Sequence, residues 1–236
     1  MNSSETLLRP PLSGICSMAT RQLLAELARI NTINGGTPLA LEAVGGVDAA
    51  RRVQAGEPFD LVFLASDAMA KLIESGHVLV DSQVDLVRSQ VAVAVKAGAR
   101  TPSIATEAEV RQAVLSAASV GYSSGPSGSA LLALLERWGI FAEVHAKLQQ
   151  APVGVPVALM VASGDVELGF QQRSEMIGAP GVHVVGELPA EISIFTVFSG
   201  GVCSASTRGD EARALLSAFA APIHAAIKLN HGMTAL

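Results

Sequence analysis

Short apolar runs alternate along this chain with longer segments in which apolar residues recur every three or four positions. The runs predict buried strands, and the periodic segments predict amphipathic helices. The expected strands cover 12–16, 39–44, 59–64, 91–95, 119–122, a short segment from 166, and 192–202. The expected helices cover 18–30, 48–54, 68–74, a segment opened by a capping box at 106–109, 130–138, 156–163 and 210–220. The alternation predicts an α/β fold with mostly parallel sheets.

Two details refine this prediction. The unbroken apolar run at 59–64 indicates a strand that is covered on both faces. The last clear helix ends before Pro222, and we expect the tail beyond His224 to be peripheral.

The composition is that of a globular protein with a large core. The chain has 236 residues, of which 50% are hydrophobic and 16% charged, and its net charge is −5. These values exclude disorder. Because the chain carries no basic cluster, it is not expected to bind nucleic acid, and any anion must be captured locally.

The cysteines, the histidines and the hydropathy limit which kinds of site and segment we expect in this chain. Cys16 and Cys203 lie in apolar segments, so we expect small buried residues, with a disulfide or reactive thiol as the alternative. Neither the cysteines nor the five histidines have metal-ligand spacing, so we expect no metal site and no cofactor. No run approaches the roughly 18 apolar residues that span a membrane.

The first residues, MNSSETLLRPPLSG, lack the apolar core of a secretory signal. We therefore expect a cytoplasmic protein as written, or a periplasmic one if the true start lies elsewhere. A membrane transporter is an expected partner only if the protein is exported. The oligomeric state is not predicted.

Three junctions between a strand and a helix are candidate anion sites. Ser17 follows the first strand as a candidate N-cap, Gly45-Gly46 follows the second, and the turn Ser123–Ser129 is rich in hydroxyls and glycine. A helix N-terminus offers free backbone N–H groups and a partly positive charge, which suit an anion. The alternative is that each is an ordinary tight turn.

Five motifs in order carry a resemblance to a known family. They are the Ser17 junction, GGVDAARRVQAGEPFDLVFLASD, the Arg88-Ser89 pair before VAVAV, GYSSGPSGS and LGFQQRSE. Over about 12–222 the chain resembles the bacterial solute-binding proteins of the molybdate-binding type. The resemblance implies a two-lobed type 2 periplasmic-binding-protein-like fold, with two mixed, mostly parallel sheets flanked by helices and joined by two crossover strands. It also implies a small anionic ligand in the cleft, closure by hinge motion, and lobes at 1–86 plus 194–236 and at 87–193.

The resemblance also assigns site residues. Ser17 matches the serine of the first strand, Gly45-Gly46 the second contact, Val155 a backbone donor, and Gln172 a tyrosine of the family. The candidate ligand-binding residues are Ser17, Gly45, Gly46, Ser66, Arg88, Ser89, Ser123, Ser124, Ser127, Val155 and Gln172.

Departures from the family pattern favour a di- or tricarboxylate over molybdate. Pro156 has no N–H, Gln172 replaces the tyrosine, and Arg88 adds a positive charge. An arginine forms two parallel bonds to a planar carboxylate. The alternatives for Arg88 are that it is a surface charge or that it pairs with Asp85. Because consecutive strand residues face opposite ways, at most one of Gln171 and Gln172 is expected to face the cleft.

The chain is also similar to the branch of this family that contains aconitate isomerase. This implies a second function, isomerisation of an unsaturated polycarboxylic acid by a 1,3-proton shift. Such a shift needs a base and a way to hold the developing negative charge. The candidates for the base are Asp67, Glu175 and Cys16, and none is assigned from the sequence.

Overall fold

A computed structural model describes residues 10–152 and 154–236 of the chain, and the strands and helices follow the predicted alternation. The strands are β1 (Leu12–Ser17), β2 (Leu39–Val44), β3 (Leu61–Ala65), β4 (Val84–Lys96), β5 (Val120–Tyr122), β6 (Leu148–Gln150), β7 (Leu168–Gln172), β8 (Val182–Glu187), β9 (Phe195–Val202) and β10 (Met233–Ala235). The α-helices are α1 (Arg21–Ile33), α2 (Gly46–Gln54), α3 (Ser66–Glu74), α4 (Glu107–Ser116), α5 (Pro126–Arg137), α6 (Phe141–Val144), α7 (Val157–Ser163), α8 (Arg173–Met176), α9 (Gly209–Ala220) and α10 (Ala225–Asn230). Short 3₁₀ helices are η1 (Met18–Thr20), η2 (His145–Lys147), η3 (Ala190–Ile192) and η4 (Pro222–His224).

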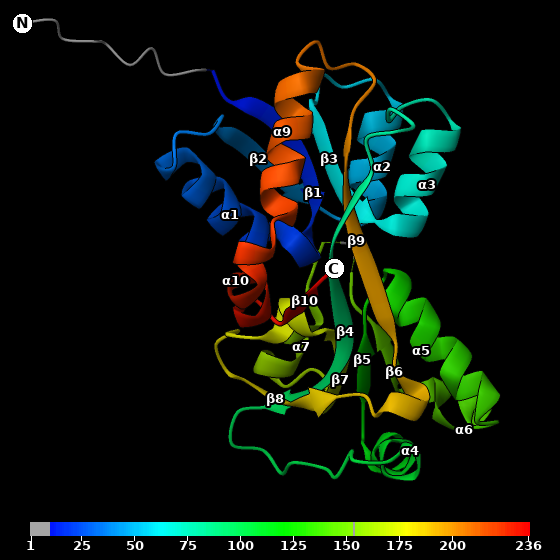
Figure 1. Cartoon of the computed structure of the whole chain (residues 1–236). Helices are drawn as coiled ribbons and strands as arrows, with labels where there is room; N and C mark the ends of the chain where they lie inside the picture. The colour runs from blue at the N-terminus through cyan, green and yellow to red at the C-terminus, as the bar shows by residue number, and fades with distance from the viewer. Residues whose placement is uncertain (1–9, 153) are drawn as a thin grey trace, which may run out of the picture.

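The molecule has two halves (Figure 1). In one half α1, α2, α3 and α9 surround β1, β2 and β3, and in the other α4 to α8 surround β5 to β8. The long strands β4 and β9 run from one half to the other. This is the expected α/β architecture with helices flanking mixed sheets.

Hydrogen bonding joins both halves into one sheet network through β4. The strand order is β2-β1-β3-β9-β4-β7-β5-β6, and β8 and β10 also pair with β4. β1 is parallel to β2 and β3, and β5 is parallel to β6 and β7. The pairs that involve β4 and β9 are antiparallel. Each half therefore has parallel strands of its own, and the two crossover strands run against their neighbours.

β4 changes its partner partway along its length. Residues from Val84 to Gln90 pair with β9, and residues from Val91 to Ala94 pair with β7. The lobe boundaries at 86/87 and 193/194 stay a prediction; the first falls within β4 and the second just ahead of β9.

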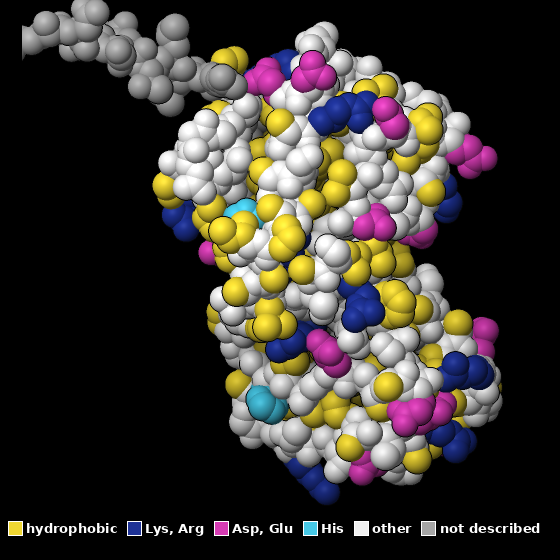
Figure 2. Space-filling model, in the orientation of Figure 1, with side chains coloured by type: hydrophobic (Ala, Val, Ile, Leu, Met, Phe, Trp, Pro, Cys, Tyr) yellow, Lys and Arg dark blue, Asp and Glu magenta, His cyan; other side chains and the backbone are white. Residues whose placement is uncertain are grey.

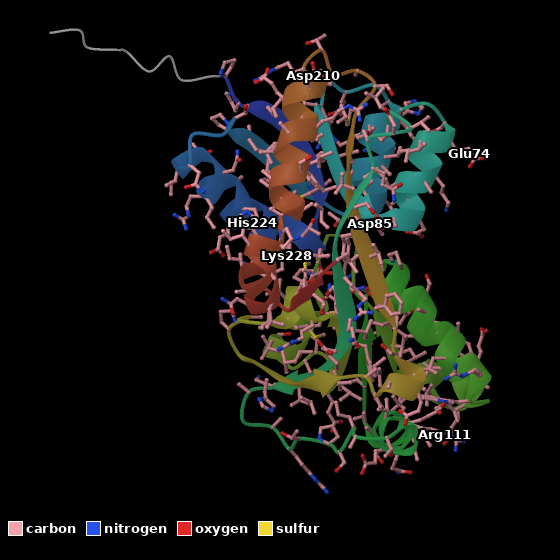
Figure 3. The ribbon with its side chains drawn as sticks, viewed as in Figure 1. Glu74, Asp85, Arg111, Asp210, His224 and Lys228 are labelled. Atoms are coloured by element: carbon pink, nitrogen blue, oxygen red, sulfur yellow. The ribbon has the colours of Figure 1, made fainter. Side chains whose placement is uncertain are left out.

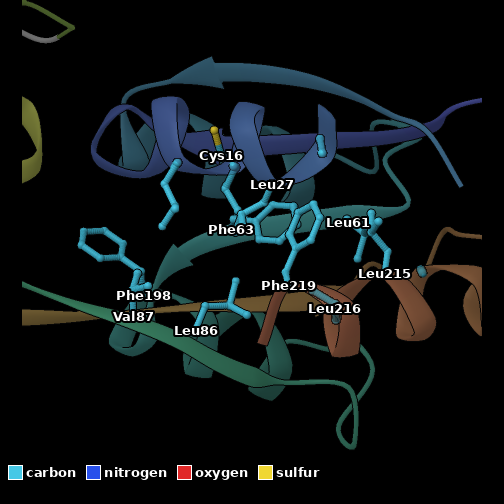
Figure 4. Close-up of a cluster of buried hydrophobic side chains, with 14 of the residues drawn as sticks. Cys16, Leu27, Leu61, Phe63, Leu86, Val87, Phe198, Leu215, Leu216 and Phe219 are labelled. Atoms are coloured by element: carbon cyan, nitrogen blue, oxygen red, sulfur yellow. The ribbon is translucent and has the colours of Figure 1, made fainter. Parts of the chain in front are cut away.

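Four apolar clusters cover the two faces of the sheet in each half. In the half that contains β3, one cluster includes side chains of α1 and α9, and another includes side chains of α2 and α3. In that core the rings of Phe63 and Phe219 stack with centroids 6.2 Å apart (Figure 4). All five residues of β3 are buried, as its unbroken apolar run predicts.

Several predicted boundaries are corrected by the structure. The helix expected from 130 begins at Pro126, because proline is favoured at the first helical position. The strand expected from 192 begins at Phe195, since the residues before it form η3. The capping box is confirmed, with the Thr106 hydroxyl accepting from the Glu109 N–H and the Glu109 carboxylate accepting from the Thr106 N–H.

The expectation that the tail beyond His224 is peripheral is wrong. It forms α10 and β10, and β10 pairs antiparallel with β4. Met233 is buried in the core next to Val87 and Phe198. A strand of three residues is too short to show an alternating pattern, which is why the sequence does not reveal it.

Residues 1–9, which form most of the N-terminal segment used to predict location, lie outside the described residues. In the part that is described, no single helix is long and apolar enough to cross a membrane. Gly209–Ala220 and Pro222–Asn230 pass that test only as a pair bent by 51°.

Candidate functional site

In the half containing β1 to β3, three predicted residues stand at the carboxyl ends of these strands. Ser17 ends β1, Gly46 begins α2 after β2, and Ser66 begins α3 after β3. Because parallel strands end at the same edge of a sheet, these positions face the other half of the molecule. A Cβ atom placed on Gly46 would lie 3.7 Å from the Cβ of Ser17.

These residues differ in how their polar groups are used. The Ser66 hydroxyl lies 2.5 Å from the Ser199 hydroxyl and 3.2 Å from the Val197 carbonyl, so it ties α3 to β9. The Ser17 side chain is buried and makes no capping bond, contrary to its expected role as an N-cap. Gly45 has a φ of −58°, so the backbone there does not require glycine. Without side chains, Gly45 and Gly46 leave space beside Ser17.

In the other half, the serine-rich turn follows β5. The hydroxyls of Ser123 and Ser127 lie 2.7 Å apart, and Ser124 is exposed. A Cβ atom on Gly128 would lie 1.8 Å from the Ser123 carbonyl oxygen, so the tight turn itself requires this glycine. A turn-forming role therefore accounts for Gly128 without a ligand.

The predicted backbone donor at Val155 is already used. Its N–H donates to the Pro152 carbonyl at 2.9 Å. The N–H of Val157 donates to Oε1 of Gln171 at 2.7 Å. This segment therefore offers fewer free amides than the family pattern implies.

The two halves meet where η1 packs against α8. These elements begin directly after Ser17 and Gln172, so the packing brings the two predicted residues towards each other. Both side chains are buried, and Ser17 Oγ and Gln172 Oε1 have no hydrogen-bond partner in the described structure. The other end of the Gln172 amide donates to the Thr196 hydroxyl at 2.7 Å.

Arg88 and Ser89 lie on opposite faces of β4, because consecutive strand residues alternate. Ser89 is fully buried and its hydroxyl donates to the Ser174 hydroxyl at 3.3 Å. The Arg88 guanidinium lies 5.3 Å from the ring centre of Phe195, and its Nε is buried without a partner in the described structure. The alternative that Arg88 pairs with Asp85 is not borne out by the ion pairs of the described residues.

A cavity of about 290 Å³ lies beside Phe195. Its walls are Ser66 and Asp67 of α3, Pro126 and Ala130 of α5, and residues 194–197 at the start of β9. It therefore opens between the two halves, and Phe195, which is 52% exposed, lies in its wall. Figure 2 shows basic and hydrophobic side chains near the narrow part of the molecule.

A larger cavity of about 540 Å³ lies away from the strand ends. It is lined by residues of α4 with Trp138 and Glu191, and Arg111 in Figure 3 marks its position at the far end of the molecule. The Trp138 indole and Arg137 both donate to Glu107 there. None of the predicted site residues line this cavity.

Residues 12–234 match the family model described as bacterial extracellular solute-binding protein. The chain belongs to this family. Aconitate isomerase from Pseudomonas sp is 38% identical over 183 residues, which are 77% of this chain and 66% of that protein, just under two thirds of its length. The resemblance drawn from the five motifs is thus confirmed at the level of the family.

Solved structures match the fold of this solute-binding protein over most of its length. The periplasmic molybdate-binding protein of Azotobacter vinelandii has a TM-score of 0.77 and 19% identity, with 94% of this chain and 98% of that chain covered. The tungstate-binding protein of Desulfovibrio alaskensis has a TM-score of 0.67 and 18% identity, with 92% and 93% covered. At these identities the likeness shows the fold and not the ligand.

Among the three candidate bases of this solute-binding protein, Glu175 has the suitable chemistry. Burial raises the pKa of its carboxyl group to about 7, and one oxygen accepts from Nε2 of Gln171 at 2.6 Å. Burial also raises the pKa of the Cys16 thiol to about 12, so this thiol stays protonated and fits the interpretation as a buried apolar residue. Asp67 is exposed in the first turn of α3.

The sequence does not single out Lys228, and it presents Gln171 only as the alternative to Gln172. Lys228 is fully buried in α10, and its Nζ has no partner in the described structure. The only signal is a single lysine within the apolar stretch IHAAIKL. No group of three or more histidine, cysteine or acidic residues that would hold a metal ion occurs in the described segments.

Proposed function

We propose that this solute-binding protein binds a small di- or tricarboxylate between its two halves and closes on it by movement at β4 and β9. The observation that carries the proposal is the set of buried polar atoms without partners. Three of the four lie on Ser17, Arg88 and Gln172, which come from the two halves and from the crossover strand between them. Buried polar groups are normally hydrogen-bonded, so such a set favours a ligand as the missing partner.

The chemistry of these groups suits a carboxylic acid. The Arg88 guanidinium and the Ser17 hydroxyl donate to carboxylate oxygens, and Gln172 Oε1 accepts from a hydroxyl or a protonated acid group. The amides of Val155 and Val157 are already bonded within the protein, which removes two donors from a molybdate-type site. The 38% identity with an aconitate isomerase also supports a polycarboxylate ligand.

Thermal-shift measurements with molybdate, sulfate, citrate, cis-aconitate and trans-aconitate test the proposal. An acid present at 100 times its dissociation constant is expected to add about 2.7 kcal/mol to the free energy of unfolding. Stabilisation by molybdate alone would contradict the carboxylate assignment.

Arg88→Ala provides the test at the level of a residue. We expect calorimetry to show that the acid which stabilises the protein binds about 1.5–3 kcal/mol more weakly to this variant, because a charge-assisted hydrogen bond is lost. Arg100→Ala is the matched control, since Arg100 is exposed in the loop after β4. Equal affinity in both variants would remove Arg88 from the site.

A second candidate function is isomerisation of an unsaturated polycarboxylic acid, and Glu175 favours it. A carboxyl group with a pKa of about 7 is suited to remove a proton from one carbon and return it two carbons away as the double bond shifts. Gln171 holds this carboxyl group and links it to the start of α7.

Proton NMR of cis- and trans-aconitate in deuterium oxide with the protein tests for turnover. We expect interconversion with deuterium incorporation, and loss of at least 100-fold in rate for Glu175→Gln. Glu74→Gln is the control, because Glu74 is exposed at the end of α3, on the outer side of the molecule (Figure 3). Binding without interconversion would leave the binding function and reject the isomerase.

A further inference from the structure

Lys228 is a buried lysine for which the described residues supply no counter-charge. Its side chain is 0% exposed, and it is the only lysine, arginine, aspartate or glutamate among the fully buried side chains of the described residues. Its Nζ has no hydrogen-bond partner in the described structure. An unpaired ammonium group in such surroundings is strongly destabilising, so the position calls for an explanation.

The segment that carries Lys228 lies across the junction of the two halves. His231, one turn further on, bonds to Glu26 of α1 at 2.6 Å. A Cβ atom on Gly232 would lie 3.2 Å from Cγ of Arg173 and 3.5 Å from the N–H nitrogen of Ser174 in α8. The segment just after Lys228 therefore lies between α1 in one half and α8 in the other, and Figure 3 shows Lys228 in the middle of the molecule.

This junction is also where the predicted ligand groups converge. η1 begins after Ser17, α8 begins after Gln172, and these two short helices pack together. β10 pairs with β4, with Met233 opposite Ser89. Ser17 Oγ and Gln172 Oε1 thus flank this junction, and Lys228 Nζ belongs to the C-terminal segment that contacts α1 and α8 beside it.

The acidic groups around this junction already have partners. Glu26 bonds to His231, Glu187 pairs with Arg173 at 3.3 Å, and Glu175 accepts from Gln171. The remaining charged or titratable groups on the packed elements are Asp85, Arg88 and Lys96 on β4, Arg21 and Arg29 on α1, and His224 on η4. Asp85 already accepts from Ser199 and Gln83. None of the described carboxylates lies within ion-pair distance of Nζ, which favours a ligand carboxylate as its partner.

We propose that Lys228 binds a carboxylate of the ligand, in a pocket formed with Ser17 and Gln172. This inference rests on the proposed carboxylate-binding function and adds a second cation to Arg88. Burial lowers the pKa of Lys228 in the unliganded protein. A carboxylate beside Nζ raises the pKa again, so binding consumes protons at a pH between the two values.

Calorimetry with citrate and cis-aconitate on the full chain tests the inference. Titrations are run at several pH values from 8 to 10.5, the ordinary pKa of a lysine side chain, and at each pH in two buffers with different ionisation enthalpies. All of these lie above the pKa of about 7 of Glu175. We expect proton uptake on binding to the unchanged protein at pH values between the pKa of Lys228 in the free protein and its pKa in the complex. Lys228→Met is expected to bind the acid about 10- to 100-fold more weakly and without that proton uptake.

Lys71→Met is the matched control, because Lys71 is exposed on α3. If the acids bind to the unchanged protein, and bind to Lys228→Met with the same affinity and the same proton uptake, this inference is overturned and the proposed function remains. Absence of binding to the unchanged protein would overturn both. Lys228→Gln is made in parallel; if circular dichroism shows that neither variant folds, Lys228 has a structural role and the inference is wrong.

Discussion

Ser17 and Ser82 are both buried, but only the Ser82 hydroxyl has hydrogen-bond partners in the described structure. Ser82 is 2% exposed; its hydroxyl donates to the Leu79 carbonyl at 2.7 Å and accepts from the Val202 N–H at 2.9 Å. Ser17 is 7% exposed, and its hydroxyl has no partner in the described structure. A buried hydroxyl without a partner lowers stability, and a ligand that supplies the partner recovers that free energy.

Replacement of each serine by alanine is therefore expected to have different effects. Ser82→Ala should lower the free energy of unfolding by about 1–3 kcal/mol, because the Val202 N–H loses its acceptor. Ser17→Ala should leave it unchanged or raise it by about 1 kcal/mol, and should weaken ligand binding. Urea denaturation measures the first effect and calorimetry the second. A loss of stability in Ser17→Ala equal to that in Ser82→Ala would show that Ser17 is a structural residue.

Some residues of the proposed site can be predicted from the sequence, and others cannot. Ser17 and Gln172 are predicted because each follows a strand at a position where the family places a ligand group. Lys228 is missed because a lone lysine in an apolar helix has the same sequence signature whether it is buried or reaches solvent. Its burial depends on how the C-terminal segment packs against the rest of the molecule, which the helix pattern alone does not show.

At the scale of elements, features that depend on neighbouring residues are predicted from the sequence, and pairing between distant segments is not. The capping box at Thr106 is found because both of its bonds lie within four residues. The β10 strand is missed because its three residues are held by β4, more than 140 positions earlier in the sequence. The pairing fixes the C-terminal segment beside the crossover strand.

Met233→Ala tests whether this segment is structural. We expect a loss of about 2–5 kcal/mol in the free energy of unfolding, because the side chain is 1% exposed and packs with Val87 and Phe198. Leu236→Ala, three residues later at a side chain that is 55% exposed, should change it by less than about 0.5 kcal/mol. Equal small effects in urea denaturation would restore the prediction that the tail is peripheral.

At the scale of the whole molecule, the alternation of strands and helices predicts the fold class, and the five motifs in order predict the family. The resemblance implies two crossover strands between the halves, but the residue at which β4 exchanges its partner, after Gln90, is not predicted. The position of the partner exchange bears on the proposed hinge motion, because such a motion needs strands that belong to both halves.

Glu175 couples the stability of the whole molecule to pH. Burial raises the pKa of its carboxyl group from 4.5 to about 7, so the folded protein holds this proton more tightly than the unfolded chain does. The stabilisation is fully present below about pH 4.5 and is lost as the pH rises through 7. The shift corresponds to about 3 kcal/mol at most.

Urea denaturation at pH 5 and pH 8 measures this coupling. The unchanged protein and the control Glu74→Gln should both lose stability between these values through Glu175, whereas Glu175→Gln should lose about 1–3 kcal/mol less. Parallel pH profiles for all three proteins would show that Glu175 ionises freely in the folded state. In that case Glu175 would lack the pKa near neutrality that makes it a suitable base, and the isomerase candidate would lose its chemical support.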